Sequence, residues 1–257
     1  MILSSVTKHV KEQNWFAVFI DFIIVVVGVF VGIQVSNWNQ IQIDNNTAGE
    51  YIARIQSDLL DNVRDMNHRN EYFSLVKTHA IAALKDFDKQ PESLGQQFLI
   101  DSYEASQSLP RLIGRDTYDE LLSVGALNTI SNLATRQRLA QYYRSSVTSQ
   151  SILVFVPSYQ NELRSTMPYK AQKPFRMGSC SHAFTTDSTG APIIKPSNSC
   201  DLNLSKQQLI NAISEIQMSG LKPHLIRVNA DIDLKLQLIQ VVVNRAKELN
   251  QFLEENK

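Results

Sequence analysis

Two cysteines are the residues of this chain that most directly suggest chemistry. Cys180 and Cys200 lie in a segment rich in glycine, serine, threonine and proline. Two cysteines in an exported domain most simply pair, and closing a loop of this length contributes about 3 kcal/mol in the chain-entropy model. A metal site built from Cys180, His182 and Cys200 is the alternative, although it lacks a clear fourth ligand and the C-x-x-C spacing of structural zinc sites. We predict the disulfide.

The other polar residues offer little catalytic chemistry. Asp119 and Glu120 are adjacent carboxylates at an expected helix start, where helix capping accounts for them. His68 and His79 share one face of a predicted helix but lie about 16 Å apart along it, too far to share a metal. The sequence contains no H-E-x-x-H, G-x-S-x-G, Walker or dinucleotide-binding motif. We therefore predict no catalytic, cofactor-binding or metal-binding residues; an enzyme with an unfamiliar site is the remote alternative.

A basic cluster is a candidate contact for a partner. The sequence YKAQKPFR, residues 169–176, places Lys170, Lys173 and Arg176 beside two aromatic residues. They could contact an acidic partner or lipid headgroups, and a solvated basic loop is the alternative. The overall charge gives no reason to expect nucleic acid as a partner, because 25 acidic and 25 basic residues balance.

These groups must be positioned by helices, and the first helix is typical of a membrane span. Residues 15–38, WFAVFIDFIIVVVGVFVGIQVSNW, are apolar over about 30 Å of helix, the hydrocarbon thickness of a bilayer, with Trp15 and Trp38 as interfacial anchors. A cleavable signal peptide is the alternative. Signal peptides have shorter apolar regions that end at a small-x-small site, whereas this segment ends in QVSNW. We predict a retained anchor in the lipid bilayer.

The positive charges favour one orientation of this span. Lys8 and Lys11 precede it, and the first basic residue after it is Arg54. By the positive-inside rule, residues 1–14 lie in the cytoplasm and residues 39–257 form an exported domain, which agrees with a disulfide. A domain of this length can bury a core as one unit or as an elongated bundle.

The span also carries a face suited to helix packing. Asp21, Gly28 and Gly32 share one helical face, and the two glycines form G-x-x-x-G, a spacing that lets membrane helices approach closely. A charged side chain in hydrocarbon costs about 3 kcal/mol on insertion scales, so we expect Asp21 to face protein or water. Alternatively, Asp21 snorkels or is protonated and the glycines are incidental. Gln34 and Asn37, at the outer interface, are possible partner contacts.

The exported domain reads as helical. Between Gly49 and Pro91 apolar residues recur every three or four positions, which predicts an amphipathic helix of about 60 Å. A shorter helix is expected over 93–109, and Thr117 with Glu120 forms a capping-box pattern for the next one.

The C-terminal half contains further helix boundaries and one irregular segment. The expected boundaries are an N-cap at Ser131-Asn132, a bend or end at Pro157, a capping box at Ser205 and Gln208, a stop at Gly220 and a start at Pro223. Residues 168–203 have no sustained period and read as a loop. We predict an all-α fold with one N-terminal transmembrane helix, an elongated antiparallel helical bundle and one disulfide-bearing loop; long helices that pair between chains in a coiled coil are the alternative.

Three pieces of the sequence together resemble one family. They are Asp21 ahead of VVVGVFVGIQVSNWNQ, the long polar helix that follows, and TYDELLSVGALNTISNLATRQRLAQYY over 117–143. Over roughly half its length the chain resembles an uncharacterised family of bacterial single-pass membrane proteins, the domain of unknown function 6090. The matching motifs are Q-x-x-N-W-N from Gln34 to Asn39 and aromatic-[DE]-E-L-[IL]-x-x-G-x-L-x-x-I from Tyr118 to Ile130. The resemblance implies membrane anchoring and a helical fold, and it brings no catalytic residues.

The expected function follows from a packing face, a large exported domain and the lack of a recognisable chemical site. We expect a bacterial inner-membrane protein with residues 39–257 in the periplasm, acting as a non-catalytic accessory or scaffolding subunit. Its span would dock against other integral membrane subunits, in a hetero-complex rather than a homo-oligomer. A ligand-sensing ectodomain is the alternative, and it would have to signal through a partner chain because only residues 1–14 precede the span.

Overall fold

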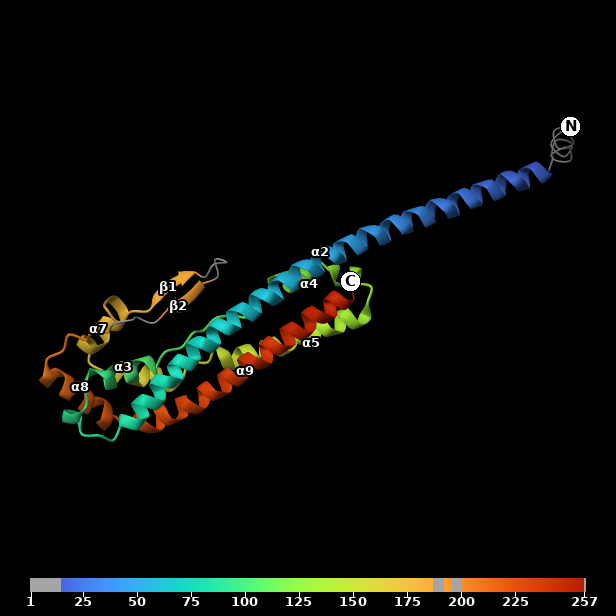
Figure 1. Ribbon diagram of the computed structural model, residues 1–257. Coiled ribbons are helices and arrows are strands. Elements are labelled where there is room, and N and C mark those ends of the chain that lie inside the picture. Colours follow the sequence, from blue (N-terminus) through green and yellow to red (C-terminus); the bar gives the residue numbers. More distant parts are fainter. Residues whose placement is uncertain (1–14, 187–191, 196–199, 257) are drawn as a thin grey trace, which may run out of the picture.

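The computed structural model describes residues 15–186, 192–195 and 200–256, and it is mostly helical (Figure 1). The two longest helices are α2 (Trp15–Asp86) and α9 (Lys222–Glu255). The helices between them are η1 (Pro91–Ser93), α3 (Gln96–Glu104), α4 (Asp116–Ser123), η2 (Ala126–Thr129), α5 (Leu133–Leu153), α6 (Ser158–Thr166), α7 (Tyr169–Met177) and α8 (Lys206–Met218). The strands β1 (Ala183–Thr186) and β2 (Pro192–Lys195) pair antiparallel, with Phe184 opposite Ile194.

Helix α2 joins the apolar segment to the rest of the molecule without a break. It contains 72 residues and so extends for about 108 Å. Gly49 does not interrupt it, since one glycine inside a helix costs only about 1 kcal/mol. The apolar window has none of its residues buried, unlike the core helix of a soluble protein. An N-terminal helix of this composition and exposure is compatible with a membrane anchor.

Helix α2 enters the hydrophobic core only well beyond this segment. Ala48, Tyr51 and Ile52 are its first residues to pack against core side chains, and Ala48 lies about 15 Å of helix rise beyond Trp38. From Ile55 onward a stripe with three- and four-residue spacing is buried, and Ile55 and Leu59 are fully covered.

Helix α9 covers that stripe along its length (Figure 1). Side-chain contacts between the two helices include Gln56 with Asn250, Asn70 with Gln240 and Lys77 with Asp233, and just beyond the end of α2 Asp88 pairs with Lys222. Residue numbers therefore rise along α2 as they fall along α9. The remaining helices pack against this pair in two clusters of core residues.

Several predicted helix boundaries are confirmed. Asn132 caps α5 by accepting hydrogen bonds from the Ala134 and Thr135 amides. Ser205 and Gln208 form a complete capping box on α8. Just beyond α8, Gly220 adopts φ 76°, a left-handed conformation that glycine accepts without strain. Pro223 lies in the first turn of α9, as expected.

Two predictions around residue 100 are wrong. Residues 93–109 do not form one helix, because only Gln96–Glu104 is α-helical after the short η1. The capping box at Thr117 and Glu120 does not form either: α4 begins at Asp116 and receives no side-chain cap. The Glu120 carboxylate makes a long-range contact with α2 instead.

The prediction of an irregular loop over 168–203 is wrong in part. Residues 169–177 form α7, in which Ala171 and Phe175 are buried one turn apart. Pro168 and Pro174 disguised this helix in the sequence, although Pro168 is its N-cap and Pro174 is tolerated inside it. The strands β1 and β2 are each four residues long, too short for an alternating pattern to be recognised.

Candidate functional site

The predicted packing face of the span is open. A Cβ atom added at Gly28 or Gly32 would meet no atom within 4 Å, and the Asp21 side chain is exposed. Gln34, Asn37 and Trp38 are exposed as well. Trp15 begins α2, and its side chain lies outside the described residues.

The continuous helix fixes the direction of this face relative to the core. Gly28 precedes Ile55, and Gly32 precedes Leu59, by about seven and a half helical turns. A half-integral number of turns places two residues on opposite sides of a helix. The glycine face of the apolar segment therefore points away from the side of α2 that α9 covers, and in the same phase the exposed residues Ala53 and Ser57 form the back of α2.

Cys180 and Cys200 form a disulfide, as predicted. The bond closes the segment that contains β1 and β2. His182 does not join the cysteines, because its Nε2 lies 2.7 Å from Glu104 Oε2 on α3, and both side chains are largely buried. Among the residues that the structure describes, no group of three histidine, cysteine or acidic side chains is arranged to hold a metal.

Acids on α3 pair with two histidines that the sequence left unassigned. Asp101 lies 2.8 Å from Nδ1 of His79, and Glu104, one turn later, holds His182. His79 is partly buried. Its acidic partner is 22 residues away, beyond any helical period, so no pattern in the sequence indicated the pair.

Glu120 links α4 to the end of the bundle nearest the span. Its Oε1 accepts hydrogen bonds from Arg54 Nη1 and from the Tyr51 hydroxyl, both at 3.0 Å, and its Oε2 pairs with Arg54 Nη2. The hydrogen bond from Arg54 lowers the pKa of Glu120. Capping was therefore the wrong explanation for this carboxylate. Asp119 pairs with Arg115 within the first turn of its own helix.

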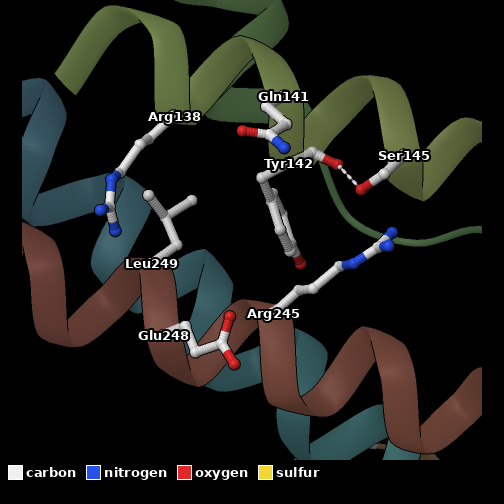
Figure 2. Close-up of a pocket in the computed structure, with 7 residues that line it drawn as sticks. All are labelled: Arg138, Gln141, Tyr142, Ser145, Arg245, Glu248 and Leu249. Carbon is white, nitrogen blue, oxygen red and sulfur yellow. Dashed lines mark hydrogen bonds between the residues drawn. The ribbon is translucent and has the colours of Figure 1, made fainter. Parts of the chain in front are cut away.

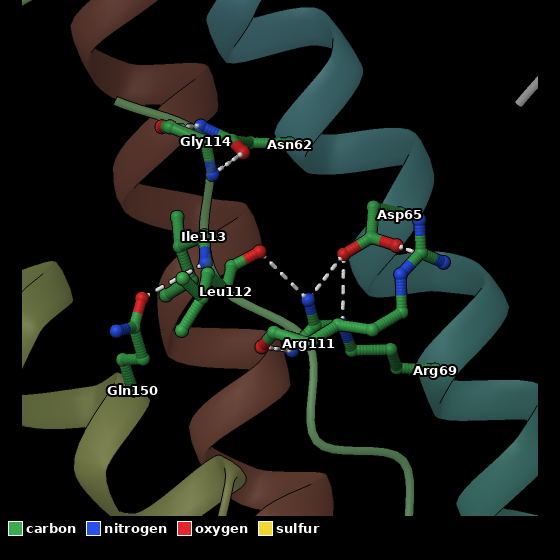
Figure 3. A network of polar contacts seen from close by, with 8 residues as sticks. All are labelled: Asn62, Asp65, Arg69, Arg111, Leu112, Ile113, Gly114 and Gln150. Atoms are coloured by element: carbon green, nitrogen blue, oxygen red, sulfur yellow. Dashed lines mark hydrogen bonds and ion pairs between the residues drawn. The ribbon is translucent and has the colours of Figure 1, made fainter. Parts of the chain in front are cut away.

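A buried arginine anchors an extended segment across the bundle (Figure 3). Arg69 is fully buried; its Nε donates to Asp65 Oδ2 at 2.8 Å, and its two terminal nitrogens donate to the carbonyls of Arg111 and Leu112. Two turns earlier on α2, Asn62 exchanges two hydrogen bonds of 2.8 Å with the backbone of Gly114. This network fixes the segment before α4 against α2, which is a structural role.

The basic cluster lies on α7. Lys170, Lys173 and Arg176 are exposed at three-residue spacing, and Lys170 donates to Gln208 on α8. Phe175 does not belong to the exposed cluster, because its ring is buried and stacked on Tyr103 with centroids 3.9 Å apart. Helices α7 and α8 lie at the end of the helical domain remote from the apolar N-terminal part of α2 (Figure 1).

A groove lies between α5 and α9 and is lined by both charged and apolar residues (Figure 2). Its volume is about 220 Å³, and its lining residues are Arg138, Gln141, Tyr142, Ser145, Arg245, Glu248 and Leu249. The sequence gave no signal for this groove, since its lining residues lie in two helices about one hundred residues apart.

One lysine is buried in the core. Lys235 is 2% exposed; its Nζ donates to the Phe155 carbonyl at 2.6 Å and lies 5.0 Å from the centre of the Phe73 ring. Burial lowers the pKa of Lys235 to about 8. Its hydrogen bond satisfies a carbonyl just beyond the end of α5, so the contact connects two helices.

No family model, curated protein or solved structure matches this chain.

Proposed function

We propose that this protein is a non-catalytic accessory or scaffolding subunit of a larger complex in the bacterial inner membrane. The observation that carries the proposal is the unbroken helix α2, whose exposed apolar segment continues directly into the core of the ectodomain. A continuous helix holds the ectodomain at a fixed rotation relative to the span. Such rigidity suits a subunit that positions other proteins.

The proposal also includes the orientation of the chain in the membrane and the arrangement of its helices. Residues 39–257 lie in the periplasm, which the Cys180–Cys200 disulfide supports, and residues 1–14 lie in the cytoplasm, which the lysines before the span support. The ectodomain is an elongated antiparallel bundle within one chain. The opposite numbering of the contacts between α2 and α9 supports this arrangement.

Other membrane subunits dock on the face formed by Asp21, Gly28 and Gly32. Close approach at the glycines and a polar partner for Asp21 would satisfy the requirements of that face. Because the face points away from the side that α9 covers, the partner runs beside the back of α2. The ectodomain then braces the partner along α2, instead of covering it with the bundle.

Kinship with the uncharacterised family of single-pass membrane proteins is part of the proposal. The residues of the shared motif have specific structural roles here: Tyr118, Leu121 and Ile130 are buried, Gly125 adopts φ 73° and Glu120 binds Arg54. These roles explain why such a motif would be kept in a helical ectodomain near its anchor.

The composition of the assembly in native membranes tests the proposal. Gentle solubilisation, a native gel and mass spectrometry of the band that contains this chain should reveal other integral membrane proteins in a fixed ratio. A lone monomer would refute the subunit role. A homo-oligomer would agree with docking through this face but would refute the hetero-complex.

A ligand-sensing ectodomain is the second candidate. The specific observation in its favour is the groove between α5 and α9, which opens beside the C-terminal half of α9 and thus beside the helix that packs on α2. A ligand that changed the spacing of α5 and α9 would act on α2, and through it on a partner in the membrane.

A further inference from the structure

The groove between α5 and α9 brings opposite charges together without pairing them. Arg138 comes from α5, whereas Arg245 and Glu248 come from one face of α9, and all three side chains are exposed. None of the three makes an ion pair or a hydrogen bond within the described part of the chain. The flat face of the Arg138 guanidinium group lies 4.1 Å from the centre of the Phe252 ring. The nitrogen edges of both guanidinium groups are therefore available to a ligand.

The wall of the groove contains an unsatisfied buried hydroxyl. Tyr142 is 4% exposed, and its ring crosses from α5 toward α9 (Figure 2). The Ser146 and Asn62 side chains lie near the hydroxyl, but the Tyr142 hydroxyl makes no hydrogen bond within the described part of the chain. The hydroxyl oxygen is covered, so the groove offers a ligand the edge of the Tyr142 ring and not its polar end.

The size and chemistry of the groove select a class of ligand. A volume of about 220 Å³ is below the range of drug-sized pockets, about 300–1,000 Å³, and suits a small metabolite. Guanidinium groups bind carboxylates with paired hydrogen bonds, and a carboxylate such as Glu248 binds an ammonium group. The Tyr142 ring and Leu249 supply apolar surface between these charged groups. A ligand with only one charge would leave either the arginines or Glu248 without a partner of opposite charge.

We propose that this groove binds a free amino acid. Its carboxylate pairs with Arg245, its ammonium group pairs with Glu248, and its side chain packs on Tyr142 and Leu249, toward Arg138 at the other end of the groove (Figure 2). The inference deepens the sensing candidate and is independent of the subunit role, since binding needs only the single chain.

Scanning calorimetry of the full chain in detergent micelles tests this inference. Each of the standard L-amino acids is added singly at about 10 mM, and at least one should raise the Tm, by about 4 °C if its Kd is a tenth of that concentration. The amine and the acid obtained by removing the carboxylate or the ammonium group of that amino acid should each shift the Tm by less than about 1 °C. An equal Tm shift with either derivative would refute the proposal that both charged groups of the amino acid are bound.

Matched variants identify the site. Arg245→Gln and Glu248→Gln remove one charged group each from the groove, and both should lose the shift while keeping the Tm of the unliganded protein, because both side chains are exposed. Arg144→Gln changes an exposed arginine of α5 that does not line the groove, and it should keep the shift. If no amino acid shifts the wild-type Tm, or if the shift survives in both groove variants, the inference is wrong. Either failure leaves the composition of the native assembly, and thus the subunit proposal, unaffected.

Discussion

Replacing Arg69 by methionine should be among the most damaging single substitutions in the helical domain. The guanidinium group is fully buried and makes three hydrogen bonds, to Asp65 and to the carbonyls of Arg111 and Leu112. Methionine would fill most of the volume but leave both carbonyls without their donor. Breaking a buried charged pair by removing one partner costs about 3–5 kcal/mol, and Arg111, which also pairs with Asp65 at 2.7 Å, limits the loss on the acid side.

The assay is urea unfolding of the full chain in detergent micelles, followed by circular dichroism at 222 nm. We expect the free energy of unfolding to fall by about 3–4 kcal/mol, a large part of the 5–15 kcal/mol typical of a domain. Arg64→Met is the matched control: this arginine lies five residues earlier on α2, is partly exposed and pairs with the exposed Asp61, so it should cost less than about 1 kcal/mol. Equal losses in the two variants would refute the claim that Arg69 anchors the segment before α4.

Three further predictions concern the core, the disulfide and α4. Burial lowers the pKa of Lys235 from 10.5 to about 8, so between these pH values the unfolded state binds more protons at this site and the free energy of unfolding rises with pH. Lys235→Met should remove a rise of about 3 kcal/mol from the plot of unfolding free energy against pH, measured by urea unfolding. Identical plots for the wild type and the variant would refute the lowered pKa of this lysine. Replacing Cys180 and Cys200 by serine should lower the free energy of unfolding by about 3 kcal/mol, and a thiol reagent that labelled the native wild-type protein before reduction would contradict the bond. Glu120→Gln should loosen α4 from α2, seen as faster hydrogen exchange of the α4 amides and unchanged exchange in α8; unaltered protection of α4 would show that its apolar contacts suffice.

What the sequence predicted well was local. The long apolar N-terminal helix, the caps at Asn132 and Ser205 and the helix stop near Gly220 depend on neighbouring residues, and all are found as expected. The disulfide was also predictable, because two cysteines leave only one intrachain pair.

What the sequence missed was long-range or concealed by proline. The contacts of Glu120 with Arg54 and of Arg69 with the Arg111 carbonyl join residues more than 40 positions apart, and no periodic pattern encodes them. Pro174 concealed α7. The α5–α9 groove arises only when the two helices lie side by side, so neither helix alone indicates a site.

The rotation of the glycine face relative to the core-facing side of α2 could have been predicted from the sequence with one assumption. The spacing from Gly28 to Ile55 predicts opposite faces only if the helix runs through Gly49 without a break, and the sequence left that point open. The structure supplies the continuity. The direction of the docking face therefore combines a sequence motif with a structural observation.

The size of the native assembly in two matched variants tests the central proposal most directly. Gly28→Ile with Gly32→Ile adds four carbons at each position of the docking face, where no atom of this chain lies within 4 Å. Val27→Phe with Val31→Phe adds the same number of carbons at the same spacing on a face about 100° away. On native gels of gently solubilised membranes, the glycine variant should release this chain from the complex and the valine variant should keep it there. A glycine variant that stays in a complex of wild-type size would contradict docking through this face.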